Sequence, residues 1–185
     1  MATQTDILNA ALVLIGEDAQ TDPASAAPGR ALVPIYDGEL DSLLEEHPWN
    51  FAEGTANLAV ASGETHPKYS TVFKLPTDYL TVRDVVRGDE DTEIYYLIAQ
   101  GRLFCDEASI SIIYTRRVTA VNEMPPTFRS ALAHRLAMRV APKFSSKYDK
   151  RDAAEALRTA KTTDAQGGGR EKPRRPQLFR DARRW

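Results

Sequence analysis

The chain has 185 residues, 42% of them hydrophobic and 27% charged, and a formal net charge of −2. This composition argues against an intrinsically disordered chain, and no apolar run approaches the roughly 18 residues that a membrane-spanning helix needs. The single cysteine, Cys105, excludes an intrachain disulfide and a cysteine-based zinc cage. Because no basic leader precedes the first apolar run, we expect the protein to fold in the cytoplasm where it is made.

Helical patterns open the chain. Thr3 and Asp6 have the spacing of a capping box, apolar residues follow on one broad face, and Gly16 predicts the end of the helix. A second helical pattern covers residues 32–47, and we expect Pro34 to kink or restart that helix. Two helices are therefore predicted before the middle of the chain.

The middle of the chain changes to the pattern of β-strands. The strand-like runs cover residues 57–61, 71–75, 80–86, 94–100, 102–105 and 110–115. Gly101 separates two of them and predicts a hairpin. Arg116 and Arg117 leave the last run on opposite faces, and the sequence leaves open which of them is a surface contact and which an ion pair. Together these runs predict one small antiparallel sheet.

A helical pattern returns after Pro125 and Pro126, with apolar residues at every fourth position beside a row of alanines. We expect Pro142 to end this helix and Asp149 to cap a final one.

This order of elements predicts an α+β fold, in which the N- and C-terminal helices form one bundle around an inserted small antiparallel β-sheet domain. The expected bundle comprises residues 1–50 and 122–166, and the expected β domain comprises residues 51–121. Residues 167–185 form a basic C-terminal arm that begins with a glycine hinge.

The charge is concentrated in that arm. Seven of the 24 basic residues but only two of the 26 acidic residues follow Gly169, so the arm carries +5 and the preceding body −7. Pro173 and Pro176 favour an extended conformation. We hypothesise that the arm docks on a partner through cationic and apolar anchors, and a disordered solubility tail is the alternative. The candidate docking residues are Arg170, Lys172, Arg174, Arg175, Leu178, Phe179, Arg180, Arg183, Arg184 and Trp185.

Five carboxylates mark the second predicted helix: Asp37, Glu39, Asp41, Glu45 and Glu46. Paired carboxylates can carry out acid–base catalysis, but a solvated helix face is the simpler interpretation.

Motifs of enzymes are missing from the sequence. It has no phosphate-binding loop, no nucleophile elbow and no zinc-protease helix. His47, His66 and His134 are far apart, and none pairs with another at the spacing of metal ligands, so we expect structural roles for them. Cys105 lies in a predicted strand and is expected in the core. We therefore expect no catalytic residue, no metal and no cofactor.

An aromatic segment follows the second predicted helix, with Pro48, Trp49, Asn50 and Phe51 in succession. Trp49 and Phe51 are expected to anchor the core where helix gives way to sheet. Further short motifs follow the same order along the chain, at residues 10–12, 15–17, 75–80, 113–118 and 126–128. Taken together over about residues 5–165, this set resembles the tail tubular protein A family, the head-to-tail adaptor proteins of short-tailed bacteriophages.

The resemblance implies a structural virion protein without catalytic residues, built as a helical bundle with an inserted β domain. It implies a homo-oligomeric ring, a dodecamer, which sits between the portal protein and the tail nozzle protein. DNA would pass through the lumen without specific binding, and no membrane would be involved. The arm lies outside the matched motifs, so its docking on the portal is a hypothesis from its chemistry alone.

An acidic body suits such a channel, because a lumen lined with Lys and Arg would hold the phosphates of the passing DNA. We hypothesise that one or more of the five carboxylates, Asp37, Glu39, Asp41, Glu45 and Glu46, line that lumen. The main rival function is a nucleic-acid-binding protein that acts through the basic arm, with an affinity that falls steeply with salt. An enzyme is the third alternative.

Overall fold

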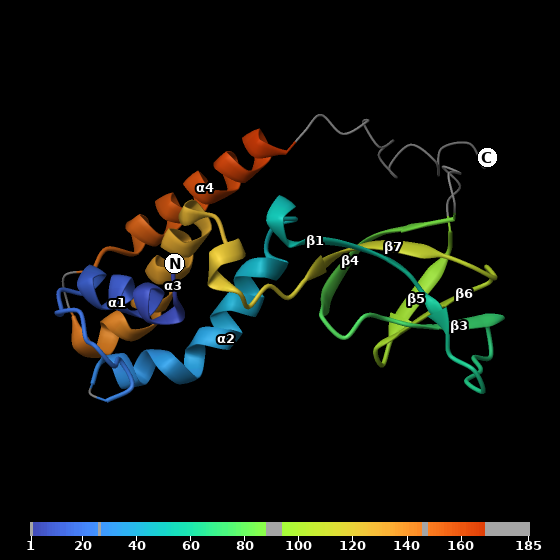
Figure 1. Ribbon diagram of the computed structural model, residues 1–185, viewed down its shortest axis with the longest axis horizontal. Coiled ribbons are helices and arrows are strands. Elements are labelled where there is room, and N and C mark those ends of the chain that lie inside the picture. The colour runs from blue at the N-terminus through green and yellow to red at the C-terminus, as the bar shows by residue number, and fades with distance from the viewer. Residues whose placement is uncertain (1, 26, 88–93, 146–147, 169–185) are drawn as a thin grey trace, which may run out of the picture.

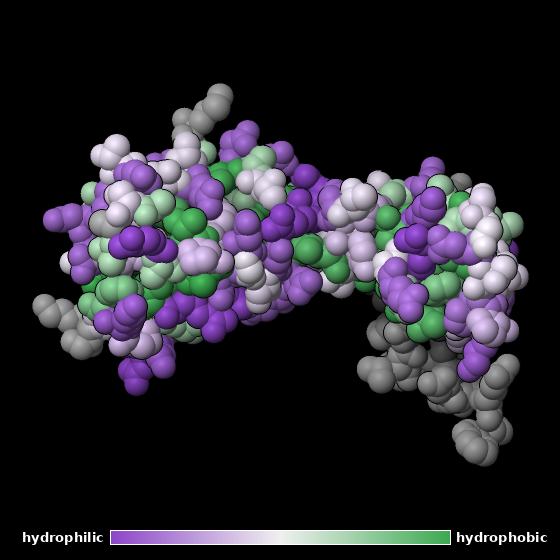
Figure 2. Space-filling view, turned by 90° about the horizontal axis from the view of Figure 1, so that it is seen from below, coloured by the Kyte–Doolittle hydropathy of each residue, from purple (hydrophilic) through white to green (hydrophobic). Residues whose placement is uncertain are grey.

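The computed structural model describes residues 2–25, 27–87, 94–145 and 148–168, and these residues form an α+β fold with two lobes (Figure 1). Helices from both ends of the chain pack together in one lobe, and the strands between them form the other. The predicted fold class is confirmed. In the space-filling view the two lobes are joined by a narrower waist (Figure 2).

The helical lobe contains α1 (Gln4–Leu14), α2 (Gly29–Glu45), α3 (Pro126–Phe144) and α4 (Lys150–Gly167). Helix α3 lies at the centre, because it packs against each of the other three. Its apolar side chains recur every three to four residues, which turns one broad buried face toward its neighbours. None of the helices in the described part of the chain is long and apolar enough to cross a membrane.

The predicted helix ends are confirmed at α1. The Thr3 hydroxyl accepts from the Asp6 backbone N–H, and the Asp6 carboxylate accepts from the Thr3 backbone N–H, which completes a capping box. Gly16 has a φ of +86°, the left-handed conformation that closes a helix most cheaply when the residue is glycine. At α4, the Asp149 side chain accepts from the Arg151 backbone N–H, as the predicted cap should.

Neither proline breaks its helix where a break was predicted. Helix α2 runs without a break through Pro34, and α3 continues past Pro142 to Phe144. A proline removes one backbone hydrogen bond, but buried side chains on both sides can hold the helix together. Leu32 and Tyr36 flank Pro34 in this way.

The β lobe holds two antiparallel sheets rather than the single sheet predicted. In the first sheet the strand order is β1 (Glu53–Asn57), β7 (Ser111–Arg116) and β4 (Tyr79–Val86). In the second it is β2 (Ala59–Val60), β3 (Thr71–Lys74), β6 (Arg102–Cys105) and β5 (Tyr96–Ala99).

Strand β1 was not predicted, because its sequence of small and polar residues lacks the usual strand pattern. Gly54 explains part of that composition: a Cβ there would come within 2.8 Å of the Tyr114 ring on β7. The predicted hairpin between β5 and β6 is confirmed, with Gln100 and Gly101 both at positive φ.

Each lobe has its own hydrophobic core. The helical core is built mainly on leucine and alanine side chains, whereas the β core fills the space around Phe73, Leu103 and Ile112. Cys105 is fully buried in the β core, as predicted, and burial raises the pKa of its thiol. The two lobes fold around separate apolar centres, Leu80 of β4 packs against the helical core, and polar contacts add to this connection.

Candidate functional site

The connection between the lobes begins with the segment 47–52, here called the junction segment, which links α2 to β1. Trp49 is 1% exposed and its ring packs edge-on against Phe128 of α3, with 4.9 Å between the ring centroids. Its indole N–H donates to the Leu43 carbonyl at 2.8 Å. Phe51 is half-buried and lies 4.8 Å from Phe128. The predicted anchoring roles of Trp49 and Phe51 are therefore both confirmed.

The other two motif residues, Pro48 and Asn50, are exposed. Asn50 instead joins the junction segment to the end of α4. Its backbone N–H donates to the Asp164 carboxylate at 3.0 Å, and its side-chain amide donates to the Asp164 carbonyl at 2.6 Å. His47 Nε2 lies 3.3 Å from the same carboxylate. Asp164 thus links the last turns of α4 to the segment that follows α2.

Arg83 links the β lobe to the junction segment through hydrogen bonds and an ion pair. From β4 its guanidinium donates to the Trp49 carbonyl at 2.8 Å and to the Thr115 hydroxyl at 2.9 Å, and it forms an ion pair with Glu53 at 3.0 Å. One side chain therefore contacts the junction segment, β1 and β7. Because a guanidinium presents several donors in a fixed plane, this arrangement restrains the angle between the lobes.

A second set of contacts between the lobes comes from Arg116, the last residue of β7, and from Arg117, which follows it. Arg116 pairs with Glu123 at 2.7 Å and donates to the Phe51 carbonyl at 3.3 Å. Arg117 pairs with Asp41 of α2 at 2.6 Å and lies 3.5 Å from Asp37. The question that the sequence left open is settled: both arginines form ion pairs, and Arg117 is the one that reaches α2.

The carboxylates of α2 do not form a freely solvated face. Glu39 is 8% exposed, and its two oxygens accept from Arg135 at 2.8 Å and Arg139 at 2.6 Å. Glu46 pairs with Arg135 and with Lys161 of α4. The prediction of a solvated helix face is therefore wrong for Glu39, and it holds only in part for Glu46, which is exposed but paired.

Glu39 is paired because α3 carries arginines at positions 135 and 139, which lie one turn apart on the side that meets α2. Asp37, Glu45 and Glu46 are the exposed members of the acidic set. Asp37 reaches only Arg117, and Glu45 forms no ion pair with any residue in the described ranges.

The electrostatics of this network favour the charged states of Glu46 and Arg135. Burial alone would raise the pKa of Glu46, but hydrogen bonds from Arg135 and Lys161 outweigh it and lower that pKa. Likewise, burial opposes the charge of Arg135, yet the two glutamates raise its pKa. Arg135 is therefore the centre of an ion-pair network that joins α2, α3 and, through Glu46, α4.

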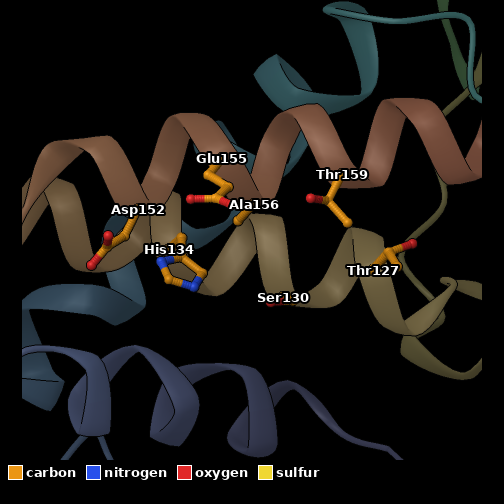
Figure 3. Close-up of a pocket in the computed structure, with 7 residues that line it drawn as sticks. All are labelled: Thr127, Ser130, His134, Asp152, Glu155, Ala156 and Thr159. Atoms are coloured by element: carbon orange, nitrogen blue, oxygen red, sulfur yellow. The ribbon is translucent and has the colours of Figure 1, made fainter.

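A cleft of about 330 Å³ lies between α3 and α4 and is here called the α3/α4 cleft (Figure 3). Its lining residues are Thr127, Ser130, His134, Asp152, Glu155, Ala156 and Thr159. In Figure 3, His134 and Asp152 lie at the same level of the cleft, on facing helices. Within the described residues, no group of acidic, histidine or cysteine side chains has the arrangement of a metal site.

His134 is held at one end of this cleft. Its Nδ1 lies 3.1 Å from the Tyr148 hydroxyl, which donates to the His134 carbonyl at 2.9 Å. Burial lowers the pKa of His134, while the Asp152 charge acts in the opposite direction. Burial, together with Asp152 and Asp149, raises the pKa of Tyr148 to about 12. The neutral forms of both rings are therefore the ones that fit the folded protein, which agrees with the predicted structural role of His134.

An NMR titration checks this electrostatic balance. We expect His134 to titrate below its ordinary pKa of 6.5 in the folded protein, and Asp152→Asn to lower the value further because it removes the opposing negative charge. A histidine with a depressed pKa contributes stability above pH 6.5, and this contribution is lost as the pH falls toward the folded pKa. A His134 pKa at or above 6.5 would contradict the environment described.

The residues that position the junction segment could not be found by sequence reasoning. Asp164 and Arg83 lie more than 30 positions from their partners in the chain, and neither belongs to a motif. The arm candidates, from Arg170 to Trp185, lie outside the described residues. Comparisons with known proteins add no constraint: no family model matches the chain, and no curated protein is significantly similar to it.

Proposed function

We propose that the protein is a structural virion component of the tail tubular protein A type, a head-to-tail adaptor that forms a ring between the portal protein and the tail nozzle protein. The ordered motifs that resemble that family support this proposal. The observation that carries it furthest is the bracing of the two lobes at the waist by Arg83 and Arg117. Such bracing suits a protein that must hold two different partners at a set distance.

The two lobes also differ in kind, which suits a closed ring. Head-to-tail assembly uses two different surfaces on each subunit, and helices at one end with sheets at the other provide them. The exposed apolar side chains fall in both lobes, with Val13 60% exposed on α1 and Tyr95 78% exposed beside β5. These are the surfaces on which we place contacts between copies or with virion partners.

For the lumen, the proposal is narrowed to the carboxylates that are exposed and are not held by cations of α3 and α4. Asp37 and Glu45 are the members of the α2 set best able to present negative charge to passing DNA, whereas Glu39 is occupied by two arginines. The basic arm is proposed to contact the portal, with arginines on acidic surface and Phe179 and Trp185 in apolar pockets.

Electron microscopy of the protein mixed with portal rings tests this function. We expect the full chain to add a ring-shaped layer to the portal, and the chain that ends at Gly168 to remain folded but fail to attach. A matched control keeps the arm and its composition but scrambles the order of residues 170–185; it should attach weakly. Attachment that is unchanged by the deletion would contradict the arm hypothesis, and a permanent monomer that ignores the portal would contradict the adaptor function. Binding to DNA that depends on the arm and falls steeply with salt would favour the rival.

A further inference from the structure

The α3/α4 cleft does not stand alone on the helical lobe. A larger cleft, of about 430 Å³, lies between α1 and α3 and is lined mainly by apolar residues such as Ile7, Ala10 and Val13. The two clefts share Ser130 and His134, so they meet across α3. We call the combined surface the paired cleft; one side of it is acidic and the other apolar.

Its acidic side carries charge that the body leaves uncompensated. Asp152 and Glu155 line the α3/α4 cleft, and neither forms an ion pair with any side chain in the described ranges. This contrasts with Glu39 and Glu46 of the same lobe, each of which binds two cations. The paired cleft therefore offers unpaired carboxylates next to an apolar hollow, a combination that fits a peptide in which arginines precede apolar side chains.

The chain itself supplies such a peptide at a suitable distance. The described structure ends at Gly168, directly after α4, and the sequence continues with Arg174 and Arg175 followed by Leu178 and Phe179. With a rise of about 1.5 Å per helical residue, Glu155 lies about 20 Å and Asp152 about 24 Å back along α4 from Gly168. An extended chain that turns at the glycines covers about 23 Å between positions 168 and 175.

This register brings Arg174 and Arg175 level with Glu155 and Asp152. Leu178 and Phe179 follow over about another 10 Å of extended chain, a length that would let the arm cross α3 beside His134 into the cleft between α1 and α3.

We propose that the arm of the free subunit folds back onto its own helical lobe, with Arg174 and Arg175 against Asp152 and Glu155, and with Leu178 and Phe179 in the apolar side of the paired cleft. Tethering supports binding within one chain, because a short linker gives the arm a high effective concentration at the cleft. This inference does not rest on the proposed adaptor function, and it holds whether or not the arm also binds a portal.

Amide NMR spectra of the full chain and of the chain that ends at Gly168 test the proposal. We expect shift differences at Ile7, Val13 and Glu155, with none in the β lobe, and we expect them to be independent of protein concentration. A synthetic peptide of residues 170–185, added to the shortened chain, should reproduce the same pattern of shifts.

Charge variants in the arm make the test specific without altering the folded body. Arg174→Glu with Arg175→Glu should abolish the shifts and weaken the peptide about tenfold or more, whereas the matched control, Arg183→Glu with Arg184→Glu, should leave both largely unchanged. Combining Arg174→Glu and Arg175→Glu in the arm with Asp152→Arg and Glu155→Arg in the cleft should restore binding of the arm to the cleft.

Four outcomes would overturn the proposal. The first is identical spectra of the two chains, and the second is shift differences that arise only as the protein concentration rises and so report a second copy. The third is shift differences that map to another surface, and the fourth is an equal loss of the shifts and of peptide binding in both pairs of charge variants.

Discussion

Replacing Trp49 by alanine is expected to lower the free energy of unfolding by about 3–5 kcal/mol. The side chain is 1% exposed and packs edge-on against Phe128, so its removal leaves a cavity between the junction segment and α3. The Leu43 carbonyl also loses the indole donor. Urea unfolding followed by circular dichroism measures the change.

The milder variant Trp49→Phe keeps an aromatic ring but leaves the Leu43 carbonyl without its donor, so we expect a loss of about 1–3 kcal/mol. It stays measurable even if the alanine variant does not fold. Tyr95→Ala is the matched aromatic control, because Tyr95 is 78% exposed and its loss should change stability by less than about 0.5 kcal/mol. Equal effects at Trp49 and Tyr95 would contradict the anchoring role of the junction segment.

Replacing Arg135 by methionine is expected to cost about 2–4 kcal/mol, because the change keeps most of the volume but removes the shared partner of two glutamates. Glu39 would be left with Arg139 only, and Glu46 with Lys161 only. The matched control is Arg139→Met: this arginine also pairs with Glu39, but its side chain is 55% exposed, so we expect a loss under about 1 kcal/mol. Similar losses in the two variants would show that Arg135 is not the centre of the network.

The same variant should alter the response to acid. Because the folded pKa of Glu46 is lowered from its ordinary 4.5, the ion pair contributes stability above that pH, and the contribution is lost as the pH falls through the folded value. Without Arg135 the pKa of Glu46 should rise toward its ordinary value. We therefore expect the free energy of unfolding of Arg135→Met to fall less steeply than that of the parent protein as the pH drops below 4.5. An unchanged slope would contradict the coupling.

Some features of the fold could be predicted because they depend on neighbours in the chain. The capping box at Thr3, the helix end at Gly16 and the hairpin at Gly101 each arise from a few consecutive residues, and all three are confirmed. Strand β1 was missed because its polar sequence is stabilised by pairing with β7, from Glu53 opposite Thr115 to Asn57 opposite Ser111. The division of the strands into two sheets likewise depends on pairing between distant segments.

In the candidate site, too, features set by neighbouring residues could be predicted and features set by distant contacts could not. The sequence correctly indicated that Trp49 and Phe51 are anchors, because large aromatic side chains between a helix and a strand have few places to go other than the core. It could not indicate that Asn50 binds Asp164, which lies 114 residues further along the chain. Nor could it indicate that Glu39 is buried, since a carboxylate enters the interior only where cations such as Arg135 and Arg139 meet it.

By itself, then, the sequence determined the order of helices and strands, the α+β class and the contrast between an acidic body and a basic arm, because these depend on local pattern and composition. The tertiary structure alone decided which charges are free. Folding brings α3 and Arg117, the residue after β7, against α2, so the carboxylates that looked most exposed along α2 are largely paired. The unpaired carboxylates of the helical lobe instead include Asp152 and Glu155, in a cleft that exists only because α3 and α4 pack side by side.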